Sequence, residues 1–305
     1  MQVRGTFSQL YDNVDKTVYA LLGKQLRELQ PIWTQIYNRK DSNRKFERFL
    51  TVTPFGDVPE KPEGNEYAFD LIRPGWEKDI TPIEFGLGFE ATETALEDDQ
   101  HDVLAKKSTW LAFSARVVQE KYAAKPFNLG FTTHKTPDGQ PLFSTAHVLK
   151  GGGTARNRPS TDADLSFQAL AEAMADVQVE TKLESGQIAA PVMEWILYVP
   201  PALEMLADRI VNSSGLPGTA DNDRNPIKSR RNITIVVNPY LSDSDAWFLV
   251  AKRKEAHGLV AVDRLPITMA DPMTDPRTGN RIYKIRFRQA WDAFTWQNTY
   301  GTSGA

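Results

Sequence analysis

The longest amphipathic pattern in the chain runs from Thr94 to Lys125. Large apolar residues recur there at spacings of three and four, as on one face of an α-helix. They are Val103, Leu104, Trp110, Leu111, Val117, Val118 and Tyr122, with Ser114 in the same stripe. Thr94 and Glu97 have the spacing of a capping box, and Pro126 is expected to end the helix at Lys125. At about 1.5 Å per residue this spine helix is about 48 Å long, so other elements must pack along it.

Residues 51–90 alternate with a period of two, which predicts β-strands. Residues 73–76 (Arg-Pro-Gly-Trp) predict a type II turn, and alternation resumes from Ile83 to Phe89. The first strand has an apolar face formed by Tyr67, Phe69 and Leu71. This pattern predicts a long hairpin. Because a two-stranded ribbon is marginally stable in water, its apolar face must rest on its own domain or on another chain.

The first fifty residues predict a helix from Val14 to Leu29, followed by a basic stretch. A single short helix is marginal alone, so it must pack on another element. The basic stretch contains Arg39, Lys40, Arg44, Lys45 and Arg48.

Residues 165–265 alternate helical and strand patterns, which indicates a compact α/β subdomain. We expect a helix through Phe167 and Val177, entered at Asp162 or Asp164, and a second helix opened by Pro201. The expected strands are 195–199, 233–237, 247–251 and 259–262. From Arg281 to Trp296 a final amphipathic strand presents Tyr283, Ile285 and Phe287 on one face, and the spine helix is its natural partner.

Composition restricts the function more than it defines it. The 305 residues have a net charge of −3, which argues against a dedicated DNA-binding domain. The absence of cysteine excludes disulfides, thiolate zinc sites and cysteine nucleophiles. No run of eighteen apolar residues predicts a membrane span, and the N-terminus lacks the apolar core of a signal peptide.

The short motifs in the sequence do not indicate a catalytic, nucleotide-binding or metal-binding site. The stretch Gly86-Leu87-Gly88 resembles a dinucleotide fingerprint, but the long helix after it and the loop that follows do not fit one. Residues 221–225 resemble a calcium loop, yet Pro226 stands where the loop needs glycine. His134 and His147 could lie close across the turn at Asp138, without a third ligand at metal-like spacing. We therefore predict no catalytic, cofactor-binding or metal-binding residues, and no cofactor.

The order of these elements resembles the tailed-bacteriophage major capsid protein. Two stretches, DGQPLFSTAHVLKGGG and YVPPALEMLADRIVNSS, resemble the major head subunit of Mu-like phages and prophages, as does NITIVVNPYLSDSDAWFLVA. The resemblance implies an α+β fold in four parts. They are an N-terminal arm (1–50), an extended loop hairpin (51–92), a peripheral domain with the spine helix (93–164 and 266–305) and an axial domain (165–265).

By this resemblance the chain is a structural subunit of an icosahedral phage head and not an enzyme. It would form hexamers and pentamers around double-stranded DNA, in a virion capsid assembled in the host bacterial cytoplasm. The ribbon would lie over a neighbouring subunit. Residues expected at that contact are Tyr67, Phe69, Leu71, Trp76, Ile83, Phe85 and Leu87. Weak contacts with DNA are expected from Arg39, Lys40, Arg44 and Lys45.

The other implied partners are a separate scaffold protein, a maturation protease and the portal protein, with no membrane. Only some fifty residues precede the ribbon, which is too short for a built-in scaffolding domain, so we expect little trimming of this chain. The alternative reading is a cytoplasmic α/β enzyme with its site in residues 165–265.

Overall fold

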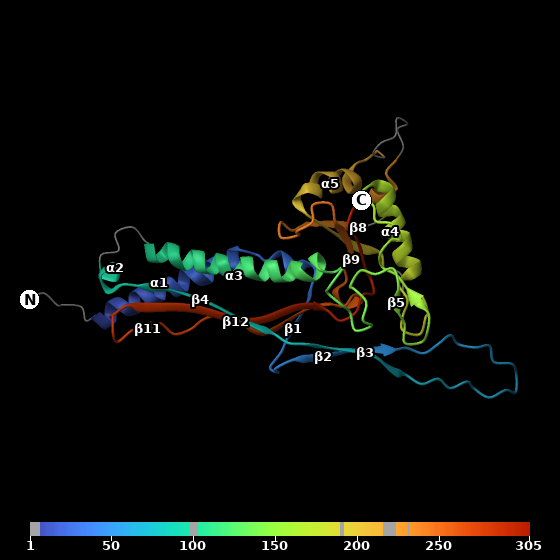
Figure 1. Cartoon of the computed structure of the whole chain (residues 1–305), viewed down its shortest axis with the longest axis horizontal. Coiled ribbons are helices and arrows are strands. Elements are labelled where there is room, and N and C mark those ends of the chain that lie inside the picture. The colour runs from blue at the N-terminus through green and yellow to red at the C-terminus, as the bar shows by residue number, and fades with distance from the viewer. Residues whose placement is uncertain (1–6, 98–102, 190–191, 216–223, 231) are drawn as a thin grey trace, which may run out of the picture.

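The computed structural model describes residues 7–97, 103–189, 192–215, 224–230 and 232–305. The molecule is elongated, with a long layer of two helices over a sheet at one end and a lobe of smaller elements at the other (Figure 1). A ribbon and its loop project beyond the lobe. Along the chain, strands and helices do not follow one another in regular βαβ units. The fold is therefore of the α+β class, as the sequence predicts.

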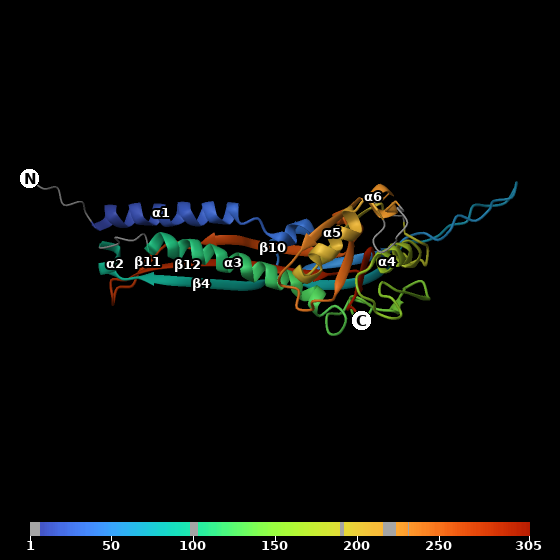
Figure 2. The same cartoon turned by 90° about the horizontal axis from the view of Figure 1, so that it is seen from above.

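The N-terminal helix α1 (Phe7–Glu28) lies along the spine helix α3 (Val103–Asn128), as Figure 2 shows from above. Val18 and Leu22 are buried in the main core. The short helix η1 (Ile32–Gln35) follows, and its backbone N–H groups at Ile32 and Trp33 donate to Glu120 of α3. The arm helix therefore packs on its own chain.

The boundaries of the spine helix differ from the prediction. A short helix, α2 (Glu93–Glu97), precedes it, and the expected continuous run crosses residues 98–102, which lie outside the described residues. The cap is Thr92 and not Thr94, because the Thr92 hydroxyl accepts a hydrogen bond from the Ala95 N–H at 3.3 Å. At the other end α3 continues past Pro126, since Phe127 is fully buried and fixes the last turn.

The buried face of α3 confirms the predicted stripe only in part. Leu104 and Leu111 are buried, and Val118 and Tyr122 pack against the core. Trp110 and Phe113 are 64% and 53% exposed, although Trp110 was expected to face the core. The fully buried positions are mostly small or polar: Ser108, Ala112, Ala115, Gln119, Ala123 and Ala124. The stripe was inferred from large side chains, whereas small side chains allow α3 to approach α1 and the sheet closely.

The large sheet has the order β1-β10-β12-β11, with β4 on the other edge of β12. Its strands are β1 (Asn38–Asp41), β4 (Ile83–Ala91), β10 (Leu259–Met269), β11 (Met273–Thr274) and β12 (Arg281–Ala293). β1 runs parallel to β10, and the other pairs are antiparallel. Tyr283, Ile285 and Phe287 of β12 are buried in the same core as the spine helix, which confirms the predicted amphipathic strand.

The predicted hairpin is wrong in its pairing. β4 pairs with β12, with Phe85 opposite Phe287, while β3 (Arg73–Ile80) pairs with β2 (Glu47–Thr53). Pro74 and Gly75 lie inside β3 rather than in a turn. Proline is tolerated there because the strand is at an edge and its partner bulges between Leu50 and Val52. The projecting loop is therefore 54–72.

The small sheet has the order β13-β9-β7-β8, from β7 (Glu194–Val199), β8 (Asn232–Val237), β9 (Trp247–Ala251) and β13 (Thr299–Thr302). Three of these strands match the prediction. Helices α4 (Phe167–Glu180) and α5 (Glu204–Asn212) cover one face of the sheet. The cap of α4 is Ser166, whose hydroxyl accepts from Ala169, and not Asp162 or Asp164.

The remaining short elements are η2 (Pro201–Leu203), α6 (Pro226–Arg230), η3 (Lys254–Ala256) and the pair β5 (His147–Val148) and β6 (Thr154–Ala155).

Strand pairing departs from the expected division of the chain at two places. Residues 259–262 belong to the large sheet through β10, and β13 from the C-terminal segment completes the small one.

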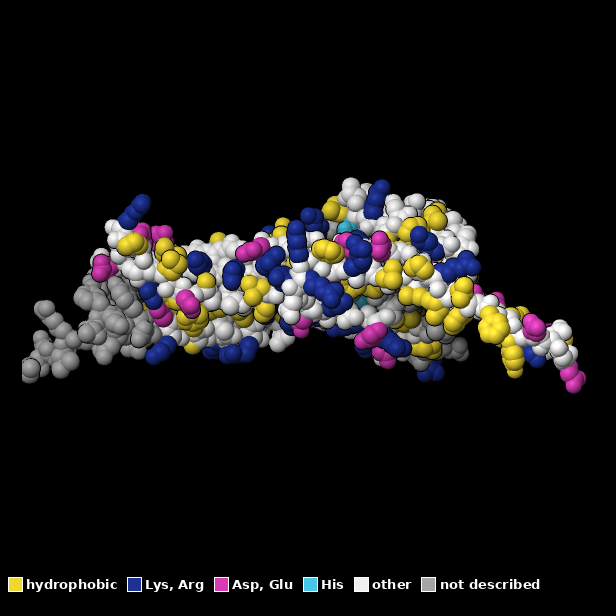
Figure 3. All heavy atoms as spheres, turned by 90° about the horizontal axis from the view of Figure 1, so that it is seen from below, with side chains coloured by type: hydrophobic (Ala, Val, Ile, Leu, Met, Phe, Trp, Pro, Cys, Tyr) yellow, Lys and Arg dark blue, Asp and Glu magenta, His cyan; other side chains and the backbone are white. Residues whose placement is uncertain are grey.

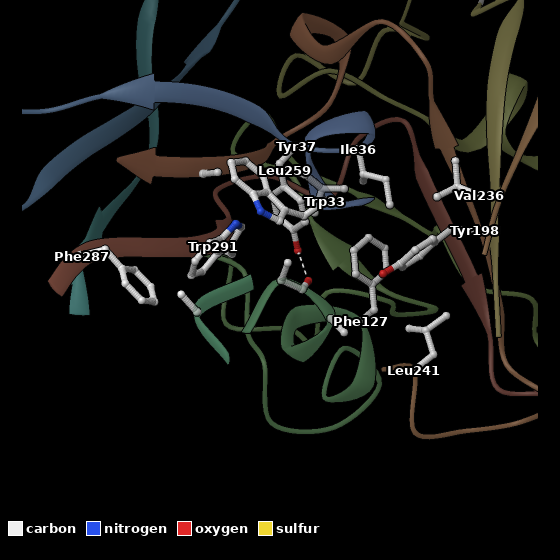
Figure 4. Packing of buried hydrophobic residues seen from close by; sticks show 14 of the residues in the cluster. Trp33, Ile36, Tyr37, Phe127, Tyr198, Val236, Leu241, Leu259, Phe287 and Trp291 are labelled. Carbon is white, nitrogen blue, oxygen red and sulfur yellow. Dashed lines mark hydrogen bonds between the residues drawn. The ribbon is translucent and has the colours of Figure 1, made fainter. Parts of the chain in front are cut away.

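An aromatic junction joins the two sheets at the end of α3 (Figure 4). The Phe127 ring lies 4.8 Å from Tyr198 of β7 and 5.1 Å from Phe248 of β9, measured between ring centroids. Tyr37 packs edge-on at 6.3 Å, and its hydroxyl donates to the Ala123 carbonyl. Side chains on the other face of the small sheet, such as Trp195 and Leu249, form a second core with α4 and α5.

The same fold separates two phenylalanines of the predicted ribbon face. Phe85 stacks on Phe287 at 4.9 Å and meets Tyr122 at 4.7 Å, whereas Phe69 is 94% exposed. We predict that Phe85→Ser lowers the free energy of unfolding by about 2–4 kcal/mol, while Phe69→Ser changes it by less than about 0.5 kcal/mol. Urea denaturation followed by circular dichroism measures both. Equal effects of the two substitutions would contradict this packing.

Candidate assembly interface

The loop 54–72 exposes more large apolar side chains than a monomer needs to. Val58 and Phe69 are 95% and 94% exposed, and Tyr67 and Leu71 are 74% and 76% exposed. Figure 3 shows hydrophobic side chains along this projection. Burying each would gain about 1.5–3 kcal/mol, and contiguous exposed apolar surface marks an interaction site. The loop is therefore the first element of a candidate interface.

The base of the loop is fixed by contacts within the chain. Phe49 of β2 stacks on Phe294 at 5.0 Å, and Arg48 binds Asp79 across the ribbon. Lys150 lies 3.8 Å above the Trp76 ring, a cation–π contact. Further out, Gly56 donates to Asp70 at 2.8 Å, which holds the two sides of the loop together. The ribbon therefore directs the loop away from the body.

A partly buried charge cluster holds β3 against β12. The Lys78 ammonium lies 2.7 Å from Asp292 Oδ1 and also donates to two backbone carbonyls, and His134 Nε2 lies 2.9 Å from the same oxygen. Burial alone would raise the pKa of Asp292, but the hydrogen bond from His134 and the charge of Lys78 outweigh it and lower the pKa. Sequence patterns did not indicate this cluster, because its members are far apart in the chain.

The seven residues expected at the contact fall into three groups. Tyr67, Phe69 and Leu71 lie on the exposed loop. Ile83 and Leu87 lie on edge strand β4 and are 49% and 53% exposed. Trp76 and Phe85 have partners in their own chain. An inter-subunit role for all seven stays a prediction. The five residues of the first two groups are the ones whose side chains are exposed and available for such a contact.

The basic residues expected to face DNA are partly neutralised. Arg39 lies 2.8 Å from Asp263, and Lys40 lies 3.6 Å from Glu47 and over the Phe49 ring. Both are in β1, so they belong to the large sheet and not to a free arm. Arg44 and Lys45 are exposed in the connection to β2.

His134 and His147 are held by different acids. His147 is fully buried, with Nδ1 2.7 Å from Asp138 and Nε2 3.0 Å from the Asn157 side-chain oxygen. The Asn157 amide nitrogen donates to the Leu142 carbonyl, which fixes that oxygen toward the ring. Both ring nitrogens therefore lie within hydrogen-bond distance of side-chain oxygen atoms. The His147 ring stacks on the Trp296 ring, with 4.5 Å between ring centroids.

Among the described residues, no three His, Cys, Asp or Glu side chains are grouped so as to hold a metal ion. No helix in the described part of the chain is long and apolar enough to cross a membrane. The calcium-like stretch 221–225 begins in residues outside the description, while Asn225 is buried and bonds to the Ile210 carbonyl.

A cavity of about 490 Å³ in the small-sheet lobe is where the enzyme alternative would place a site. It is lined by Ala189, Val192, Met193, Glu194, Arg253, Glu255, Ala256 and Asn298. Its two carboxylates pair with cations, Glu194 with Lys252 at 3.6 Å and Glu255 with Arg253 at 3.9 Å. The described lining contains no nucleophile beside a base, so nothing here favours catalysis.

The comparisons with known proteins identify the class of protein to which this fold belongs. A family model described as phage capsid protein matches residues 77–300. Since this is more than half of the chain, the chain belongs to the phage capsid protein family. No curated protein matches it significantly.

Several solved structures share the fold. The capsid of cyanophage P-SCSP1u has a TM-score of 0.61 at 11% identity, covering 90% of this chain and 88% of that one. The virus-like particle of Pyrococcus furiosus gives 0.55 at 11%, over 94% and 98%. The procapsid of bacteriophage JBD30 gives 0.55 at 14%, over 97% and 76%. The predicted resemblance to tailed-phage capsid proteins is thus confirmed, while the narrower one to Mu-like heads stays a prediction.

The Asp138–His147 pair generates a prediction about acid stability. Burial would raise the pKa of Asp138, but hydrogen bonds from His147 and Thr136 dominate and lower it. A lowered folded-state pKa stabilises the protein above the unfolded value of about 3.9, and this stability is lost as the pH falls through the folded value. We predict that Asp138→Asn costs about 3 kcal/mol at pH 7 and less at low pH. Thermal melts across this range test it, with exposed Asp243→Asn as the control. A pH-independent cost would contradict it.

Proposed function

We propose that the chain is the major subunit of an icosahedral phage head, which assembles into hexamers and pentamers and encloses double-stranded DNA. Membership of the phage capsid protein family supports the structural role. The observation that supports assembly is the projecting loop 54–72, whose apolar side chains have no surface of their own chain to cover them. The loop of one copy would cover part of the next.

A contact between two different surfaces of identical subunits is heterologous. Such contacts close into rings when the rotation between subunits closes, and hexamers and pentamers are rings of this kind. The anchored ribbon supports this reading, because a fixed base gives each copy the same loop direction. The proposal does not include catalysis.

Other partners follow from the family alone. We propose a separate scaffold, a maturation protease and the portal protein as partners during assembly in the bacterial cytoplasm, in a head of the Mu-like kind. Their surfaces on this chain are not assigned.

Removing the loop tests the proposed function. Because Gly56 and Asp70 are hydrogen-bonded, residues 57–69 can be replaced by a short Gly-Ser link without moving β2 or β3. We predict a soluble subunit that melts within a few degrees of the wild type and forms no shells, rings or sheets. Electron microscopy and circular dichroism measure the two results. Normal shells from this variant would refute the role of the loop, and so would unfolding of the subunit.

Contacts with DNA should be weak. The chain has a net charge of −3, and Arg39 and Lys40 are already paired with acids. We predict salt-sensitive binding of duplex DNA by the free subunit, reduced by Arg44→Ala with Lys45→Ala and little changed by Arg39→Ala. Fluorescence anisotropy at two salt concentrations measures it. Nanomolar binding that survives moderate salt would contradict it.

A further inference from the structure

A second cavity lies where the N-terminal segment meets the body of the molecule. It has a volume of about 320 Å³, and its walls come from α1, η1 and β1 on one side and from α3, β10 and β12 on the other. The η1 segment follows the end of α1 that lies toward the lobe (Figure 2). A molecule held in this cavity would therefore contact both the N-terminal segment and the body.

Three buried polar atoms of the cavity wall lack a partner. Trp33 is 4% exposed, and no described residue accepts a hydrogen bond from its indole Nε1–H. Asp263 is 5% exposed, and no donor in the described ranges bonds to its Oδ1. Among the same residues, no acceptor meets the buried Nε–H of Arg116. Buried polar groups are nearly always hydrogen-bonded, so these two donors and one acceptor indicate a polar occupant.

Arg116 is a partly buried cation whose hydrogen-bond partners are neutral. Its terminal nitrogens donate to the Gln119 side-chain oxygen at 2.8 Å and to the Leu26 carbonyl at 2.6 Å. Burial lowers the pKa of Arg116, and the charge of Glu120 offsets this only in part. An anion in the cavity would therefore stabilise the guanidinium.

Asp263 needs a hydrogen-bond donor rather than a counter-ion. Its charge is already met by Arg39, which lies 2.8 Å from Oδ2. Burial raises the pKa of Asp263, and Arg39 and Gln289 offset this only in part. Gln289 lies beside the carboxylate without hydrogen-bond geometry at Oδ1, and its own side-chain oxygen accepts from Gln119 at 2.6 Å. A hydroxyl would satisfy Oδ1 without adding a charge.

Contacts within the chain hold the cavity wall in place. Glu120 Oε1 accepts from the backbone N–H groups of Ile32 and Trp33, which fixes η1 on α3. The Trp33 ring packs edge-on against Trp291, with 5.6 Å between ring centroids (Figure 4). A site that is formed before binding loses less conformational entropy when a ligand enters.

The rest of the wall and its charge define the class of ligand. Apolar side chains on the wall favour a short carbon skeleton; they are Leu26, Pro31, Pro266 and Ile267. The charged lining residues are two arginines and one aspartate, so the wall carries a formal charge of +1 and a ligand of charge −1 neutralises it. A carboxylate matches the planar guanidinium of Arg116. Inorganic phosphate would add a second negative charge and leave the apolar wall uncovered.

We propose that the cavity between η1, α3 and β10 binds a small hydroxycarboxylate, with its carboxylate at Arg116 and Trp33 and its hydroxyl at Asp263. Bound there, the ligand bridges the N-terminal segment to the body and holds the two together. This site goes beyond the proposed assembly and does not depend on it, because all of its contacts lie within one copy.

Water is the other occupant that could satisfy these atoms, since a cavity of this size holds several water molecules. The hydroxycarboxylate is favoured for two reasons. Water brings no negative charge to Arg116, and it leaves the apolar part of the wall without a partner.

Binding of a series of small probes to the full-length chain tests the proposal. The probes are 2-, 3- and 4-hydroxybutyrate, which differ in the distance between hydroxyl and carboxylate. We expect one of them to bind at millimolar concentration, at least about fivefold more tightly than butyrate, which lacks the hydroxyl. Butanol, which lacks the carboxylate, and inorganic phosphate are the other comparisons. Isothermal titration calorimetry measures the affinities.

Hydrogen exchange locates the bound probe in the chain. The best hydroxybutyrate should slow amide exchange in residues 29–37, which connect α1 to β1, because it bridges this segment to α3 and β10. Exchange in α4, which packs in the second core, should not change.

A pair of tryptophan variants separates the site from its surroundings. Trp33→Phe removes an N–H of the cavity wall and should weaken binding of the best probe about fivefold. Trp291→Phe is the matched control, because its buried Nε1–H also lacks an acceptor among the described residues, but Trp291 does not line the cavity. Arg116→Gln should weaken binding at least about tenfold. Circular dichroism and thermal melting check the fold of each variant.

Every result supports or overturns the assignment. If no probe binds, or if butyrate or phosphate binds as tightly as the hydroxybutyrates, the cavity holds only water or a simple anion and the proposal is wrong. It is also wrong if Trp33→Phe and Trp291→Phe weaken binding equally, or if exchange in residues 29–37 does not slow. Shell formation is measured separately by electron microscopy, so loss of the proposed assembly function would leave these results unchanged.

Discussion

The packing of Phe127 is the interaction on which the rest of this structure depends. Its ring contacts Tyr198 and Phe248 of the small sheet, while its helix lies on the large sheet, so one buried side chain belongs to both halves of the molecule. Pro126 disfavours the continuation of α3, because proline has no backbone N–H to donate to the preceding turn. The burial of Phe127 offsets this cost and keeps the last turn helical. The junction therefore fixes the direction of the long layer relative to the lobe, and with it the direction of the loop that leaves beside the lobe (Figure 1).

The local pattern of apolar residues predicted the strands that are covered by the chain's own core on one face or on both. β12 was found from Tyr283, Ile285 and Phe287, and β9 was placed at its observed limits, because these strands are covered by the chain's own core. Helix α4 followed from its apolar spacing for the same reason. The buried face of α3 could be predicted from large side chains only in part, at Leu104 and Leu111. Close packing there selects alanine and serine, and a small residue gives no periodic signal.

Pairing and exposure were the parts that local sequence could not provide. Phe69 and Phe85 have the same alternating neighbours, yet Phe69 is exposed and Phe85 packs against the core. The difference comes from β12, about two hundred residues away along the chain, which pairs with β4 and leaves 54–72 uncovered. The anchors at the base of the loop, Lys150 on Trp76 and Lys78 on Asp292, are also long-range contacts. Sequence reasoning could identify an apolar ribbon but not which part of it remains free.

A free apolar segment is a hazard before it finds its partner, and the composition of the loop addresses this. Exposed extended chains with apolar side chains pair edge to edge, and charge and proline are the usual means of preventing it. Residues 54–72 combine a net charge of −4 with prolines at 54, 59 and 62. Like charges keep free loops of different copies apart, and each proline removes a backbone donor from any strand that would pair with the loop. The same acids that repel another loop attract a basic surface, so the charge that protects the unassembled subunit also favours contact with a surface of opposite charge over contact with another loop.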